Sequence, residues 1–140
     1  MKLSLAAFAL CVLAACAPAT QVLQVDPTGR VAFEIQQNYQ PVYRKVLERA
    51  RACHQAAGTL VEGDLYTDLR SGKISVAVLT LFGFDTPMTV ELTSVADQRT
   101  NVEVRFTDNA TNEWQRSAAA VEKWLKEGST DCPGRRTSGT

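Results

Sequence analysis

Between residues 61 and 107 the chain repeats one pattern, in which short apolar-rich segments alternate with tight turns. The last two segments alternate cleanly between apolar and polar side chains, as half-buried strands do. The segment 74–82 is the most apolar and is typical of a central strand. Since parallel neighbours need crossovers of a dozen or more residues, these short connections predict an antiparallel meander. The expected strands are 61–69, 74–82, 88–93 and 101–107, with turns at 70–73, 83–87 and 96–99.

A helix is expected before the first of these strands. Asn38 is a suitable N-cap, and Pro41 falls in the first turn, where proline is tolerated. Gly58 is the expected C-terminal stop. Apolar side chains recur at the three-to-four spacing of one buried helix face: Tyr39, Tyr43, Val46, Ala50, Cys53 and Ala57. Cys53 should therefore point inward near the end of this helix.

A second helix is expected after the last strand. Asn112 and Gln115 have the spacing of a capping box, which favours a helix start at this point. Gly128 is the expected end. The buried stripe of this helix should consist of Trp114, Ala118, Val121 and Leu125.

Charged side chains on the polar faces of the strands indicate that one face of the sheet meets water, so the helices should cover the other face. This predicts a two-layer α+β sandwich over residues 31–132, a four-stranded antiparallel meander with two helices on one face in the order α-β-β-β-β-α. Residues 31–35 are compatible with a short strand or a packed lead-in. Residues 133–140 offer no apolar side chain to bury and are expected to form a mobile tail.

The N-terminal residues 1–15 have the layout of a secretory signal peptide. Lys2 supplies a positive charge, and an uninterrupted apolar run follows it and ends in small residues. At about 1.5 Å per residue, this run is too short to cross a hydrocarbon core of about 30 Å as a permanent helix.

The stretch Leu13-Ala14-Ala15-Cys16 resembles the lipobox of bacterial lipoproteins. The resemblance implies cleavage before Cys16 and attachment of diacylglycerol to its sulfur. Ala17 stands where an Asp typically retains such proteins in the inner membrane, so the resemblance favours the periplasmic side of the outer membrane. Two or more acyl chains anchor a protein stably. Residues 16–30 are then expected to be a lipidated, flexible tether.

Cys53 and Cys132 are the two cysteines that remain outside the signal peptide and the lipobox. In an exported small domain, such a pair favours a disulfide. Closing a loop of this length contributes about 4–5 kcal/mol in the chain-entropy model. The alternatives are a metal site or a catalytic thiol that uses the neighbouring His54. Three ligands fall short of a closed zinc site, and adjacent helix residues do not face each other.

The composition excludes some function classes. The 15 basic residues are balanced by 15 acidic ones, whereas a nucleic-acid-binding domain normally shows a basic excess. No phosphate loop, nucleophile elbow or zinc motif is present in the sequence, so no catalytic residue, cofactor or metal is expected. Glu62, Asp64 and Asp68 could act as paired carboxylates, but solvated sheet faces commonly carry such acids.

Two regions are candidate binding surfaces. Phe82 and Phe84 flank a glycine in the turn segment 82–87, and they either cap the core or contact a partner. The first helix is basic, and its charges either face solvent or meet membrane phosphates. The basic residues are Arg44, Lys45, Arg49 and Arg51.

The expected function is that of a non-enzymatic, periplasm-facing lipoprotein that binds an envelope protein as an accessory subunit. The alternative is a carrier or sensor of a small or lipid-like ligand. A sizeable apolar cavity would favour the carrier. Its lining would consist of Val76, Val78, Val90 and Phe106.

Overall fold

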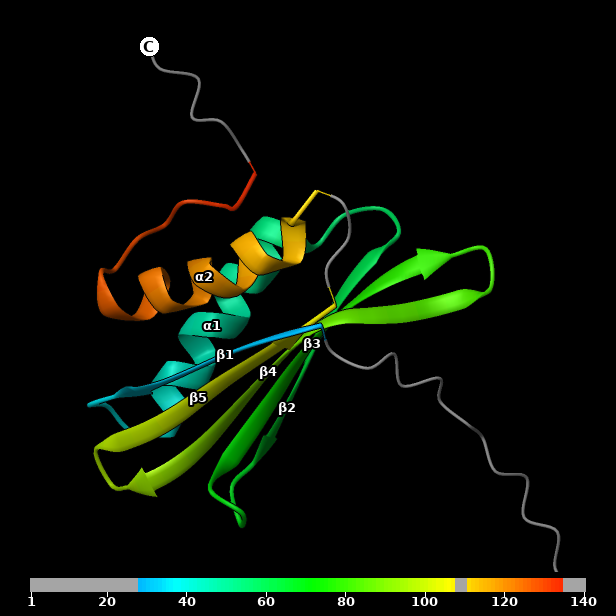
Figure 1. Ribbon diagram of the computed structural model, residues 1–140. Coiled ribbons are helices and arrows are strands. Elements are labelled where there is room, and N and C mark those ends of the chain that lie inside the picture. The colour runs from blue at the N-terminus through cyan, green and yellow to red at the C-terminus, as the bar shows by residue number, and fades with distance from the viewer. Residues whose placement is uncertain (1–27, 108–110, 135–140) are drawn as a thin grey trace, which may run out of the picture.

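The computed structural model describes residues 28–107 and 111–134. The expected signal peptide, Cys16, residues 17–27 of the tether and residues 135–140 of the tail lie outside these ranges. The elements are β1 (Gly29–Ile35), α1 (Tyr39–His54), β2 (Thr59–Tyr66), β3 (Ser71–Thr80), β4 (Gly83–Ala96), β5 (Arg99–Phe106) and α2 (Glu113–Lys126). The strands form one antiparallel sheet in the order β1-β5-β4-β3-β2 (Figure 1).

The predicted α+β class and antiparallel meander are confirmed, but the predicted count of four strands is wrong. The fifth strand is β1, which pairs with β5 along its whole length, with Phe33 opposite Val102. Its inward side chains Val31, Phe33 and Ile35 contact the core, so residues 31–35 form a strand. The element order is therefore β-α-β-β-β-β-α. Gly29 and Arg30, assigned to the tether from the sequence, already belong to this strand.

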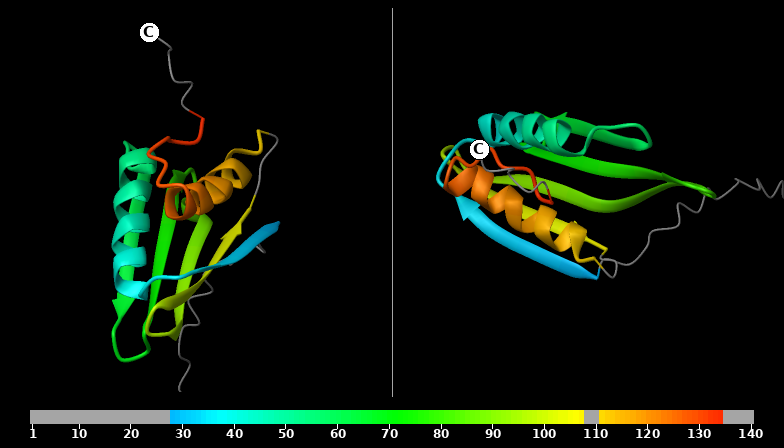
Figure 2. Two further views of the ribbon diagram at one scale, coloured as in Figure 1. Left: turned by 90° about the vertical axis from the view of Figure 1, so that its left-hand side faces the viewer. Right: turned by 90° about the horizontal axis from the view of Figure 1, so that it is seen from above.

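Both helices cover the same face of the sheet, as predicted (Figure 2). Helix α1 packs mainly against β2 and β3, and α2 packs against β1 and β5. The core lies between the two layers. Its fully buried side chains come from both helices and from the central strands, and they include Val42, Val46, Ile74, Val76, Met88, Val90, Leu92, Val102, Val104, Val121 and Trp124.

The expected break at residues 83–87 does not exist, because β4 begins at Gly83 and pairs with β3 up to the turn at Leu81 and Phe82. The register shifts by one residue between Val76 and Val78. This bulge accommodates Pro87, which has no N–H to donate to a regular ladder. The β3–β4 hairpin is consequently longer than the sequence pattern predicted.

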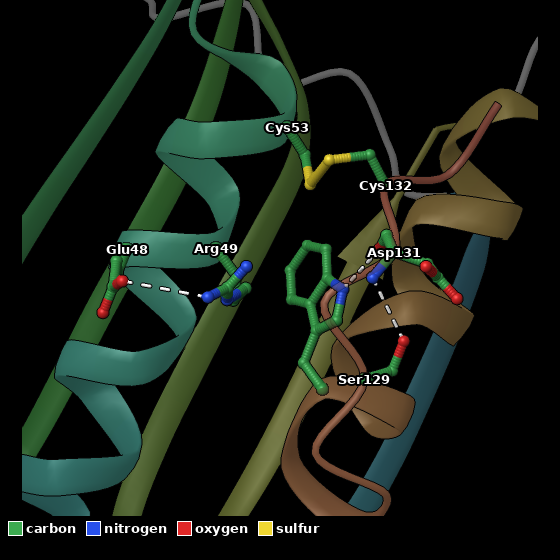
Figure 3. Close-up of a disulfide and its surroundings, with 7 residues drawn as sticks. Glu48, Arg49, Cys53, Ser129, Asp131 and Cys132 are labelled. Atoms are coloured by element: carbon green, nitrogen blue, oxygen red, sulfur yellow. Dashed lines mark hydrogen bonds and ion pairs between the residues drawn. A yellow bond between two sulfur atoms is a disulfide. The ribbon is translucent and has the colours of Figure 1, made fainter. Parts of the chain in front are cut away.

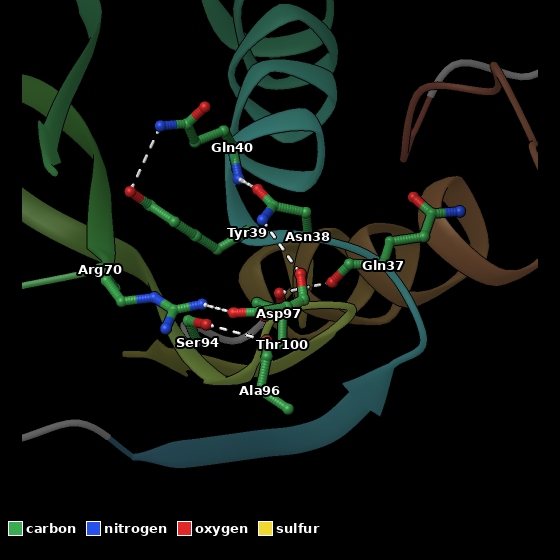
Figure 4. Close-up of polar contacts among 9 residues, drawn as sticks. All are labelled: Gln37, Asn38, Tyr39, Gln40, Arg70, Ser94, Ala96, Asp97 and Thr100. Atoms are coloured by element: carbon green, nitrogen blue, oxygen red, sulfur yellow. Dashed lines mark hydrogen bonds and ion pairs between the residues drawn. The ribbon is translucent and has the colours of Figure 1, made fainter.

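The predicted N-cap of α1 is confirmed. The Asn38 side chain accepts a hydrogen bond from the Gln40 N–H at 3.0 Å and donates one to the Asp97 carbonyl at 3.0 Å. The Thr100 hydroxyl donates to the Gln37 carbonyl at 2.8 Å. These contacts join the β1–α1 connection to the β4–β5 turn (Figure 4), with an ion pair between Arg70 and Asp97 at 2.6 Å alongside.

Gly58 does not end α1, contrary to the prediction, since the helix stops at His54 and the Gln55 N–H closes its last turn on Arg51. Ala57 therefore lies beyond the helix. Gly58 instead has a φ of +80° in the connection to β2. Its carbonyl accepts a hydrogen bond from the Leu79 N–H at 2.7 Å.

The predicted capping box of α2 is wrong. Asn112 precedes the helix, but it adopts a left-handed conformation with a φ of +51°, and its side chain makes no capping hydrogen bond. The predicted stop is confirmed. Gly128 has a φ of +68°, and the Ser129 N–H donates back to the Lys123 carbonyl. All the predicted stripe residues are buried, together with Trp124, which the stripe omitted.

The predicted disulfide between Cys53 and Cys132 is present, with a Cα–Cα distance of 5.2 Å (Figure 3). It joins the last turn of α1 to the segment that follows α2. The indole N–H of Trp124 donates to the Asp131 carbonyl at 2.9 Å and fixes the same segment. Because each sulfur is bonded to the other, neither cysteine is a free thiol or a metal thiolate in this structure.

Candidate functional site

The β3–β4 hairpin projects beyond the rest of the sheet (Figure 1). Pairing of β2 with β3 begins at Val78, and pairing of β5 with β4 ends at Met88. Residues 79–86 therefore form a two-stranded ribbon, and no other strand within residues 28–107 and 111–134 pairs with it on either side. The ribbon ends in the turn at Leu81 and Phe82.

Four large apolar side chains of this ribbon are exposed to solvent. Leu81 and Phe82, at the turn, are 97% and 99% exposed. Leu79 and Phe84 are opposite each other in the strand register and are 56% and 59% exposed. The two phenylalanines therefore do not cap the core. We call Leu79, Leu81, Phe82 and Phe84 the apolar tip.

The turn has its own polar support, so its conformation does not depend on burial of the apolar tip. The Thr80 hydroxyl donates to the Gly83 carbonyl at 2.9 Å and accepts from the Phe82 N–H at 3.3 Å. Gly83 has a φ of +127°, which side-chain-bearing residues rarely adopt. The sequence thus specifies a tight turn that presents two bulky apolar residues to water.

Exposure of this kind is unfavourable unless another surface covers it. Transfer of apolar area out of water is worth about 25 cal/mol per Å², and full burial of a leucine or phenylalanine side chain contributes about 1.5–3 kcal/mol. Single exposed apolar residues are ordinary, but a contiguous group marks an interaction site. Among the described residues, the other large exposed apolar side chains lie away from this ribbon, in the sheet at Leu60, Tyr66 and Val95 and in the β2–β3 turn at Leu69.

A cavity of about 400 Å³ lies at the base of the ribbon. The end of α1 contributes His54, β3 and β4 contribute Val78 and Asp85, and the start of α2 contributes Glu113 and Trp114. The His54 and Trp114 rings lie with their centroids 5.8 Å apart. Burial lowers the pKa of His54, and the nearby carboxylate of Glu113 offsets this only in part, so the imidazole is neutral at pH 7.

Sequence reasoning missed this cavity and half of the apolar tip. The sequence pattern places Leu79 and Leu81 in a central strand. The alternation of apolar and polar residues does not show which end of such a strand is buried and which is exposed to solvent. The cavity is lined from residue 53 to residue 114 by segments that are distant in sequence. No local pattern identifies such a site.

The basic residues of α1 are not part of the same site. Arg44 and Arg51 are exposed, whereas Lys45 and Arg49 are half-buried. Arg49 lies 3.9 Å from Glu48 (Figure 3). The charge of Arg51 acts on Tyr43, whose pKa is raised by burial and by Asp64 and partly lowered again by Arg51.

The three acids that could act as paired carboxylates are all exposed to solvent. Glu62 and Asp64 are exposed on β2, and Asp68 lies in the turn that follows this strand. Within residues 28–107 and 111–134, no group of three or more histidine, cysteine or acidic residues is arranged to hold a metal ion.

The residues proposed to line the apolar cavity of a carrier do not lie together around one cavity. Val76, Val90 and Phe106 belong to the packed core between sheet and helices. Of the four residues proposed for its lining, only Val78 lines the cavity at the base of the ribbon.

The outer face of the sheet carries a group of ion pairs. Glu103 on β5 accepts hydrogen bonds from Arg30 on β1 and from Arg105, and Arg105 also lies 3.7 Å from Glu91 on β4. The hydrogen bond from Arg30 is the main reason why the pKa of Glu103 lies below its ordinary value. These contacts link β1, β4 and β5, so we interpret this group of charged residues as stabilising the sheet.

Comparison with known proteins assigns the chain to no family, since neither a family model nor a curated protein matches it. In the part of the chain that the structure describes, neither helix is long and apolar enough to span a membrane.

Proposed function

We propose that this chain is a lipid-anchored lipoprotein on the periplasmic side of the outer membrane. In this proposal it catalyses no reaction and binds another envelope protein as an accessory subunit of an envelope assembly. The lipidated residue is Cys16, in the lipobox-like stretch that ends the apolar N-terminal run. The observation that carries the binding role is the exposed apolar tip of the β3–β4 hairpin.

The physical chemistry of the apolar tip supports a protein partner. Aromatic and large apolar residues that insert into a pocket carry most of the binding energy of typical interfaces. The two residues at the turn are almost completely exposed, so nearly their whole apolar area remains available for burial by a partner. The hydrogen bonds of Thr80 hold the turn in shape before binding, which reduces the ordering cost.

The position of the N-terminal strand supports a partner near the membrane. β1 begins at Gly29, which pairs with Phe106, and Phe106 also pairs with Met88 at the base of the ribbon. The chain from Cys16 therefore enters the domain at the end from which the ribbon projects. Residues 17–28 would span at most about 40 Å when fully extended, so the apolar tip would stay near the anchoring membrane.

Site-specific photo-crosslinking in the intact envelope tests this proposal. A photoreactive phenylalanine analogue replaces Phe82, and the matched control replaces Gln98, an exposed residue in the turn at the opposite end of the sheet. We expect a discrete adduct with one envelope protein from position 82 and none from position 98. The adduct should disappear when Leu81 and Phe84 are both changed to Ser.

Two results would contradict the proposal. An adduct of position 82 with lipid alone would make the membrane surface the occupant of the apolar tip. Equal adducts from positions 82 and 98 would indicate non-specific collisions. The anchor is tested separately, because a Cys16→Ser variant should lose incorporation of a labelled fatty acid and partition from the membrane into the soluble fraction.

A further inference from the structure

The cavity at the base of the ribbon has the size and the chemistry of a binding site. Its volume of about 400 Å³ lies within the range of about 300–1,000 Å³ that is typical of small-molecule sites. Its lining comes from the end of α1, the start of β2, the β3–β4 hairpin and the start of α2. The disulfide at Cys53 lies in its wall.

The charge of the lining is negative. Asp85 and Glu113 contribute carboxylates, and none of the described residues that line the cavity is lysine or arginine. His54 adds no positive charge, since burial lowers the pKa of its imidazole. An anionic ligand would be repelled here, whereas a cation would gain from both carboxylates.

A further residue of the lining suits a cationic ligand. Trp114 lines the cavity, and tryptophan is the aromatic side chain that attracts cations most strongly.

The cavity and the apolar tip occupy opposite faces of the same ribbon. Val78 is paired with Asp85, and both line the cavity, whereas the next pair, Leu79 and Phe84, is exposed as part of the apolar tip. Successive strand residues point to opposite faces, so this alternation follows from strand geometry. A partner that grips the ribbon thus meets an apolar surface on one face and an acidic cavity on the other.

We infer that the cavity binds the cationic head of a lysine or arginine side chain, with its apolar stem along Val78 and Pro87 and its charge between Asp85 and Glu113. This inference rests on the proposed function, because the protein that binds the apolar tip supplies the basic side chain. The partner then presents a large apolar pocket and, close to it, a projecting lysine or arginine.

An NMR titration of the folded domain with n-butylammonium chloride tests the inference without a partner. We expect saturable shifts of the Trp114 indole and the His54 imidazole signals. Trp124 serves as an internal control, because its indole is fully buried and hydrogen-bonded to Asp131, outside the cavity. Sodium butyrate, of the same length and opposite charge, should leave all these signals in place.

Charge-neutral variants locate the binding site. Asp85→Asn combined with Glu113→Gln should weaken butylammonium binding by about tenfold or more, since two charged hydrogen-bond acceptors are lost. Glu127→Gln removes one exposed carboxylate at the far end of α2 and should leave binding unchanged. Glu113 also lies in the first turn of α2, where an acid stabilises the helix dipole. Asp85→Asn alone is therefore measured as well and should weaken binding without disturbing the helix.

The possible results separate this inference from the proposed function. Equal responses to butylammonium and butyrate, an unchanged affinity in the double variant, or no response at all would overturn the cationic site. The crosslink from position 82 would stand in each of those cases, because it reports only on the apolar tip. Conversely, selective butylammonium binding without any adduct from position 82 would leave the cavity a cation site and overturn the ribbon as a docking element.

Discussion

Leu79 and Phe84 lie opposite each other across the two strands of the β3–β4 ribbon, and each is more than half exposed to solvent. The two residues form a regular antiparallel pair, and neither belongs to the hydrophobic core. This pairing places an apolar pair directly behind the exposed turn at Leu81 and Phe82. The hairpin therefore presents a water-exposed apolar surface that lies outside the hydrophobic core.

Changes in the apolar tip should affect binding and leave stability almost unchanged. We expect Leu81→Ser and Phe82→Ser to change the free energy of unfolding by no more than about 0.5 kcal/mol, as is usual at exposed positions. Met88 is fully buried in β4, so Met88→Ala should lower the free energy of unfolding by about 2–5 kcal/mol. Urea denaturation measures all three. A large destabilisation by Phe82→Ser would show that this side chain packs against the domain.

Loss of either cysteine should destabilise the domain by the same amount. The disulfide closes a long loop, with a sequence separation of 79, so Cys53→Ser, Cys132→Ser and the double variant should each cost about 2–5 kcal/mol. Chemical denaturation under non-reducing conditions gives these values. Quantitative labelling of both thiols in the exported, unreduced protein would contradict the presence of the bond.

The two helix starts should respond differently to removal of an asparagine. Asn38→Ala should cost about 1 kcal/mol, since its side chain both caps α1 and reaches the Asp97 carbonyl. Asn112→Gly should slightly stabilise the domain, because Asn112 makes no capping hydrogen bond and has a positive φ, which glycine adopts without strain. Thermal unfolding compares the two variants. A larger loss from Asn112→Gly than from Asn38→Ala would contradict the observed capping.

Glu103 should contribute to stability in a pH-dependent way. Its pKa is lower in the folded protein than in the unfolded chain, because Arg30 and Arg105 hydrogen-bond the ionised form. The contribution is therefore present above the unfolded pKa and lost as the pH falls through the folded pKa. Glu103→Gln should lower stability at pH 7 by a few tenths to about 1 kcal/mol. The difference from the unmodified domain should shrink steadily below about pH 4.

Urea denaturation at a series of pH values measures this difference. Glu127→Gln is the matched control, because Glu127 is an exposed acid at the end of α2. A constant difference between Glu103→Gln and the unmodified domain from pH 7 to pH 3 would contradict the role assigned to the ion pairs.

Alternation identified the strands that pair with their neighbours in sequence. It correctly predicted the inward-facing residues of β4 and β5. It therefore also predicted which face of the sheet is exposed to solvent and which face is buried. It left β1 open between a strand and a lead-in, since its partner β5 is distant in sequence. Only the tertiary pairing of Phe33 with Val102 separates the two possibilities.

Glycine and proline were the main sources of error. Gly83 and Pro87 were interpreted as breaking a strand, whereas a bulge in β4 that includes Pro87 lets the hairpin continue. Gly58 was interpreted as a helix stop, although the helix ends at His54 and Gly58 serves the next connection. Glycine and proline each occur in turns, in bulges and at helix ends. The packing of the surrounding elements decides which of these structures forms.

The candidate site was predictable only in part. Phe82 and Phe84 were identified as candidates, but their exposure depends on how far β3 and β4 extend beyond β2 and β5. The disulfide was predicted from the expected export of the chain and from the cysteine count. The acidic cavity depends on the meeting of α1, β2, β3, β4 and α2, and no local sequence pattern indicates it.

The crosslink from position 82 in the native envelope tests most directly whether the apolar tip binds a protein. We predict a single adduct with one envelope protein that forms from position 82, is absent from position 98 and is lost in the Leu81→Ser, Phe84→Ser background. Recovery of lipid adducts only, or of the same set of proteins from both positions, would contradict the ribbon as a protein-docking element.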